Sequence, residues 1–156
     1  MHFSLRYLAL ILCLGSLNAL AQASEFDQYL QEKNIINADY KIINASELNN
    51  ILALLSAEDS KTLPLQIDQN TIIEQLHLDS QQTRLKGLIS TPDFAQFEKD
   101  LGKKEVLKLI RNNLIQNCDV FFEHEYQRRN PYLIKLSLRS INNSYELEIK
   151  AKDCKF

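Results

Sequence analysis

The sequence has no tryptophan, one methionine, three glycines and three prolines. With so few glycines it has no glycine-rich loop of the kind that holds phosphate groups. It also lacks the G-x-S-x-G nucleophile elbow and the H-E-x-x-H zinc motif. Its 156 residues are enough for one domain. No catalytic residue, metal site or cofactor is predicted.

The chain also lacks an excess of basic residues, with 18 Lys and Arg against 20 Asp and Glu. Loss of residues 1–23 would remove only Arg6 from this balance and would leave a net charge of −3, from 17 basic and 20 acidic residues. Proteins that bind nucleic acid through its phosphates are typically basic. Nucleic acid is therefore not an expected partner.

A long apolar run occurs only at the N-terminus, between Tyr7 and Leu20. Arg6 precedes this run, and the A-x-A spacing of Ala21 and Ala23 follows it, as at a signal peptidase site. The run is shorter than the roughly 20 residues of a transmembrane helix. We therefore predict a cleaved signal peptide over 1–23 and no stable membrane span in the mature chain. A retained anchor is the alternative.

Two cysteines, Cys118 and Cys154, follow the predicted cleavage site. Isolated cysteine pairs in an oxidising compartment usually form a disulfide. Such a bond would stabilise the folded protein by about 4 kcal/mol, because closing the loop lowers the chain entropy of the unfolded state. Two separate thiols are the alternative.

The chain after the leader divides at Pro64. Residues 24–62 are predicted to form a helical N-terminal extension, with a helix from Ser46 to about Ser56. Residues 63–156 are predicted to form an α+β domain. It begins with a hairpin whose strands lie near 71–78 and 83–90. Two helices then follow, one opened by Pro92 and Asp93 and one that begins near Lys103.

A second hairpin is predicted at the C-terminus, because Tyr132–Arg139 and Tyr145–Ala151 both alternate apolar and polar residues. A two-residue turn at Asn142 and Asn143 would make the numbers of facing residues sum to 285. Leu138 would then face Leu147, and Leu136 would face Ile149. On the other side of the sheet, Arg139 would face Glu146.

The segment 119–129 fits two structures. As a strand it would place Val120, Phe122, His124 and Tyr126 on one face. As a helix it would continue the apolar phase of the preceding helix and would bring Cys118 toward Cys154. We favour the helix, which leaves a small antiparallel sheet of two hairpins packed against helices.

Several features resemble small uncharacterised secreted domains of Gram-negative bacteria. These are Leu63-Pro64, Ile67-Asp68 with Thr71, a cysteine on a helix (Cys118) and a second cysteine after the last hairpin (Cys154). The resemblance covers residues 63 to 154 and supplies no catalytic residues. It implies a periplasmic or secreted protein of a Gram-negative bacterium.

We expect an exported, non-enzymatic domain that binds a protein or a cell-envelope polymer, as an envelope accessory, an inhibitor or a secretion-associated factor. One candidate surface is a basic patch near Lys103, formed by Lys104, Lys108, Arg111, Arg128 and Arg129. The outer face of the C-terminal hairpin is another candidate surface.

Two alternatives remain open. One is a small secreted hydrolase or effector enzyme that uses Glu123, His124 and Glu125. The other is a small-ligand carrier. Of the two histidines after the leader, His77 is predicted on a strand face and His124 on a charged helix.

Overall fold

A computed structural model describes residues 23–156, so that all of the predicted signal peptide except Ala23 lies outside the described residues. The described helices are α1 (Glu25–Glu32), α2 (Ala45–Asp59), α3 (Phe94–Leu101), α4 (Lys103–Gln116), α5 (Cys118–Phe121) and α6 (Glu125–Arg129). Two 3₁₀ turns are η1 (Ser60–Thr62) and η2 (Ala151–Asp153). The strands are β1 (Leu65–Gln66), β2 (Thr71–Leu78), β3 (Gln82–Ile89), β4 (Leu133–Arg139) and β5 (Ser144–Lys150).

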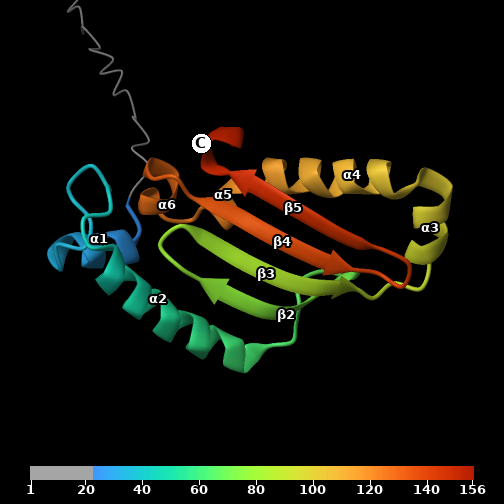
Figure 1. The fold of residues 1–156 in the computed structure, drawn as a ribbon, viewed down its shortest axis with the longest axis horizontal. Helices are drawn as coiled ribbons and strands as arrows, with labels where there is room; N and C mark the ends of the chain where they lie inside the picture. The colour runs from blue at the N-terminus through green and yellow to red at the C-terminus, as the bar shows by residue number, and fades with distance from the viewer. Residues whose placement is uncertain (1–22) are drawn as a thin grey trace, which may run out of the picture.

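The strands form one sheet in the order β1-β2-β3-β4-β5, as Figure 1 shows. Every neighbouring pair is antiparallel except β3 and β4, which run parallel. Helices α3 to α6 form the connection that a parallel pair requires. The structure thus confirms the predicted α+β fold of two hairpins packed against helices, and it joins the hairpins through a parallel contact.

The inner face of the sheet carries the core. Alternate residues of β4 and β5 are buried, as expected for strands with one solvated face. Helix α4 packs beside β5, and α2 lies along β2 (Figure 1). Residues 24–62 share the same core through α1, α2 and the segment between them, which bury Leu30, Ile35, Ile36, Leu48 and Leu52.

Helix α2 also packs along the edge of the sheet that β2 forms. Strand β1 pairs with only two residues of β2, and α2 approaches the rest of that edge. The Leu78 amide donates to Ser56 Oγ at 2.8 Å, and the Ser80 amide donates to Asn49 Oδ1 at 2.7 Å. Side chains of α2 therefore accept hydrogen bonds from amides at the end of β2. Unpaired amides at a sheet edge could otherwise pair with a strand of another chain.

The structure confirms the first hairpin, with one strand at 71–78 as predicted and the other at 82–89, one residue earlier than the predicted 83–90. A bulge between Ile73 and Gln75 shifts its pairing by one residue. Gly87 lies opposite Ile73, where a Cβ would collide with the Ile72 carbonyl oxygen. This position therefore requires glycine.

The register predicted for the C-terminal hairpin was wrong by two residues. Leu136 pairs with Leu147, and Leu138 pairs with Tyr145. A loop at Ser140–Asn143 replaces the two-residue turn, because Ser140 Oγ accepts hydrogen bonds from the amides of Asn142 and Asn143. A shift of two residues leaves each side chain on its predicted face.

Two helix predictions also need correction. Helix α2 begins after Asn44, whose Oδ1 accepts from the Glu47 amide, and so starts earlier than the predicted Ser46 cap. Segment 119–129 is helical in two short pieces, α5 and α6, with a break at 122–124. The strand alternative for this segment was wrong.

Candidate functional site

An apolar groove of about 850 Å³ lies between α4 and the inner face of the sheet. It exists because α4 packs beside β5 and leaves part of β2 and β3 uncovered. Ile73 and Leu76 of β2 and Leu85 and Ile89 of β3 line it. Leu136 and Leu138 of β4 contribute as well.

The rim of the groove exposes large apolar side chains from separate segments of the chain. Leu109 of α4 is 50% exposed, and Val120 of α5 is 72% exposed. Leu65 of β1 and Ile67 after it are 49% and 54% exposed. A cluster of exposed apolar residues around a concavity is typical of a binding surface.

The charges that line the groove all have one sign. Asp59 and Asp68 are its only ionisable lining residues in the described chain. Asn70, Asn113 and Asn117 add neutral polar groups. An apolar ligand with positive charge at its borders would match this lining.

The disulfide supports one end of the groove. Cys118 and Cys154 are joined, with their Cα atoms 5.9 Å apart. Cys118 begins α5, which carries the groove residues Val120 and Phe121. Because the bond ties α5 to the chain after β5, it holds these two side chains in place.

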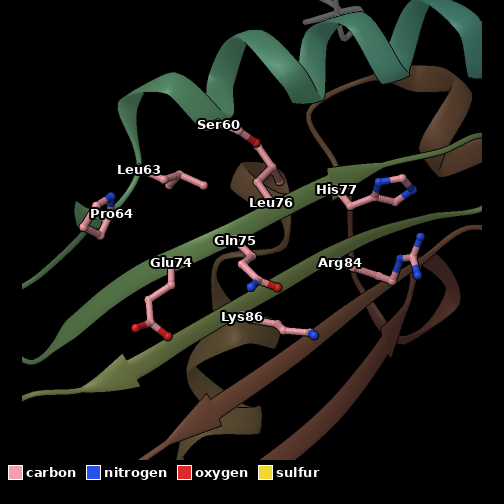
Figure 2. A pocket seen from close by; sticks show the side chains of 9 residues that line it. All are labelled: Ser60, Leu63, Pro64, Glu74, Gln75, Leu76, His77, Arg84 and Lys86. Carbon is pink, nitrogen blue, oxygen red and sulfur yellow. The ribbon is translucent and has the colours of Figure 1, made fainter.

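A second hollow of about 680 Å³ lies on the outer face of the sheet, beside the segment that leaves α2 (Figure 2). Ser60, Leu63 and Pro64 form one side of it, and the Leu63–Pro64 peptide is cis. Residues of β2 and β3 form the other side, and they are mostly polar or charged: Glu74, Gln75, Leu76, His77, Arg84 and Lys86.

The residues of the predicted basic patch do not form one continuous surface of unpaired charges in the structure. Lys104 and Lys108 of α4 are exposed, and Lys108 lies 3.7 Å from Glu105. Arg111 donates to the Glu148 carbonyl oxygen and pairs with Asp153.

Arg128 and Arg129 both pair with Glu125. Arg128 also pairs with Asp119, and its guanidinium lies over the Phe156 ring. Three of the five predicted patch residues, Arg111, Arg128 and Arg129, are therefore engaged within the protein.

His124 belongs to a polar cluster that caps α6. Its Nδ1 shares a 2.8 Å hydrogen bond with Ser24 Oγ, which also donates to Asp27 at 2.7 Å. The buried Asp27 carboxylate accepts from the amides of Glu125 and Tyr126. Ser24 and Asp27 are residues that the sequence reasoning missed.

This cluster differs from a catalytic triad. Asp27 binds the serine and two backbone amides, whereas a triad carboxylate orients the histidine. Burial lowers the pKa of His124, and the nearby Asp27 and Glu123 only partly oppose this effect. The rings of Phe26 and Tyr126 contact the histidine. The arrangement thus joins α1 to α6.

No group of three or more potential metal ligands occurs within residues 23–156. None of the helices described for these residues is both long enough and apolar enough to cross a bilayer.

No protein-family model matches the chain, and no curated protein matches it. Among solved structures it is similar to the pilotin of the type 2 secretion system of Vibrio vulnificus. The TM-score is 0.50 at 10% sequence identity, over 72% of this chain and 96% of the pilotin. The chain shares its fold with this pilotin.

A second structural neighbour is a protein from Pseudomonas aeruginosa that is described as a putative secreted protein. It has a TM-score of 0.47 and 13% identity, over 72% of this chain and 97% of that protein.

Proposed function

We propose that the protein is an exported, non-enzymatic accessory of a secretion apparatus in the cell envelope. In this role it would hold a helical segment of a protein partner in the groove between α4 and the sheet. The apolar groove carries this proposal, because it is a preformed concavity with exposed apolar residues on opposite sides. The predicted signal peptide, the disulfide and the pilotin-like fold all accord with it.

The dimensions and lining of the groove favour an amphipathic helix as the occupant. Helix-in-groove recognition uses apolar residues at i, i+3, i+4 and i+7 on one face of the bound helix. Leu109 and Val120 on one side, with Leu65 and Ile67 on the other, would contact such a face. Because Asp59 and Asp68 are the only charged residues within 23–156 that line the groove, we propose lysine or arginine beside the apolar face of the partner helix.

Photo-crosslinking in the producing cell tests this proposal. A photoreactive residue at position 109 would lie in the groove, whereas the same residue at exposed position 104 lacks any groove contact. We expect a protein adduct from position 109 alone, and its crosslinked peptide should be an amphipathic sequence with basic flanks. Val120→Glu should abolish the adduct while leaving the melting temperature within about 3 °C, because Val120 is largely exposed.

Equal adducts from positions 104 and 109 would contradict the proposal, as would an adduct that survives Val120→Glu. The groove volume also lies within the range of small-molecule sites. Native mass spectrometry of the purified protein separates the two functions, because a carrier would show a bound small mass that Leu109→Glu removes.

A further inference from the structure

A basic band runs along the centre of the outer sheet face, on β3 and β4. It consists of Arg84 and Lys86 on β3 and Lys135 and Arg139 on β4. Arg84 and Lys135 occupy paired positions in the parallel register. Lys86 lies beside Ser137, and Arg139 lies beside Leu88. All four side chains therefore project from the face opposite the groove.

This band breaks a rule of sheet stability. Like charges on paired positions of neighbouring strands repel each other, yet Arg84 and Lys135 are direct neighbours. Such violations of local consistency are expected at functional sites. The basic band is therefore a candidate interaction surface on a protein whose overall charge is negative.

Arg139 forms a 2.8 Å ion pair with Glu74, whereas the other three residues of the band have longer ion pairs or none among the described residues. Arg84 lies 3.8 Å from Asp79, and Lys135 lies 3.3 Å from Glu148, and both basic side chains are about half exposed. Exposed pairs of this kind contribute little to stability and exchange easily. Lys86 has no carboxylate within 4.0 Å among the described residues. An external anion could therefore bind Arg84, Lys86 and Lys135 and leave the shorter Arg139–Glu74 pair intact.

Acidic residues border the band on both sides. Glu74 on β2 pairs with Arg139 at 2.8 Å, and Glu146 and Glu148 lie on β5. A broad anionic surface, such as a membrane, would meet these carboxylates and be repelled. A narrow, linear anion that follows β3 would meet fewer of these carboxylates than a broad surface would.

The spacing within the band matches an extended peptide. Arg84 and Lys86 are two residues apart on one strand, which separates them by about 7 Å. Alternate side chains of an extended peptide have the same separation. Gln75 and His77, in the adjoining hollow of Figure 2, could hydrogen-bond with its backbone.

We propose that the basic band binds an extended acidic peptide segment with carboxylates at alternate positions. The four basic side chains of this surface project from the face of the sheet opposite to the groove. The protein would then contact two segments of its partners at once, one helical and apolar, the other extended and acidic.

Fluorescence anisotropy with two labelled decapeptides tests this proposal. One alternates glutamate and threonine, and the other has the same composition with its glutamates in one block. At low salt we expect the alternating peptide to bind at least tenfold more tightly than the block peptide. Salt should weaken this binding. The double variant Lys86→Glu/Lys135→Glu should weaken it at least tenfold, and Lys86→Gln/Lys135→Gln should weaken it to a smaller extent.

The matched control is Lys104→Glu/Lys108→Glu on α4, which changes the net charge equally and should bind like the unmodified protein. Leu109→Glu should also leave this binding unchanged, which separates the proposal from the function of the groove. Equal affinity for both peptides, or equal binding by both charge-reversed variants, would overturn the proposal. Binding only to phosphatidylglycerol vesicles or to dextran sulfate would overturn it as well.

Discussion

At the scale of single residues, Glu98 is a buried carboxylate that accepts hydrogen bonds from three side chains. Only 3% of this residue is exposed. The Tyr145 hydroxyl donates to it at 2.5 Å, and the Ser140 hydroxyl and the Asn142 amide also donate. Burial alone would raise the pKa of Glu98, but these hydrogen bonds outweigh it and lower the pKa below its usual value. The carboxylate thus ties α3 to the loop between β4 and β5.

The variant Glu98→Gln tests this assignment. A carboxylate with a depressed pKa contributes stability above the unfolded-state pKa of about 4.3, and this stability is lost as the pH falls through the folded-state pKa. We expect Glu98→Gln to lower the free energy of unfolding by about 1–3 kcal/mol at pH 7. The difference from the unmodified protein should shrink below about pH 4. Urea denaturation at pH 7 and at pH 3.5 measures it, and a difference independent of pH would contradict the prediction.

At the scale of elements, local sequence patterns predicted the positions of strands where apolar residues alternated with polar ones or where turn residues flanked an apolar run. The strand 71–78 was predicted from two apolar runs that flank a polar turn, and the strand 133–139 was predicted from its alternation. The register of the C-terminal hairpin was missed because Ser140, through its hydroxyl, stabilises a longer loop than Asn142 and Asn143 alone suggest. A one-residue bulge at Glu74 likewise has no local signature.

The disulfide acts at this scale, because it joins α5 to the end of β5 through Cys118 and Cys154. We expect Cys118→Ser/Cys154→Ser to lower the free energy of unfolding by about 2–4 kcal/mol. Val120 and Phe121 should also lose their fixed positions, so that amide hydrogen exchange of residues 118–122 should accelerate more than that of β2. Equal acceleration in both segments would show that the bond supports the whole fold and has no special effect on this end of the groove.

At the scale of the whole molecule, neither the groove nor the basic band could be predicted from the sequence. The groove combines residues of η1, β1, β2, β3, α4, α5 and β4. The basic band depends on the parallel contact of β3 and β4, whose pairing spans about fifty residues of chain and has no local signal. Sequence reasoning therefore placed Arg139 on the outer face of one hairpin but could not add Arg84 and Lys86 of the other hairpin.

The same scale decides whether residues 24–62 are an appendage or part of the fold. Helices α1 and α2 and the segment between them bury five large apolar side chains, which are Leu30, Ile35, Ile36, Leu48 and Leu52. Full burial of one such side chain contributes about 1.5–3 kcal/mol. Burial of all five side chains therefore contributes a free energy similar to the whole stability of a typical domain, which is about 5–15 kcal/mol. Asp27 also supplies the cap of α6.

We therefore expect the fragment 63–156 to be unfolded on its own, even with its disulfide intact. Circular dichroism and heteronuclear NMR of this fragment against the chain 24–156 measure the difference. A separate peptide of residues 24–62, added in excess, should restore dispersed amide signals, because its apolar face and the exposed core of the fragment would bind each other. A fragment that folds cooperatively without the peptide would show that the α+β unit is independent and that α1 and α2 only pack onto it.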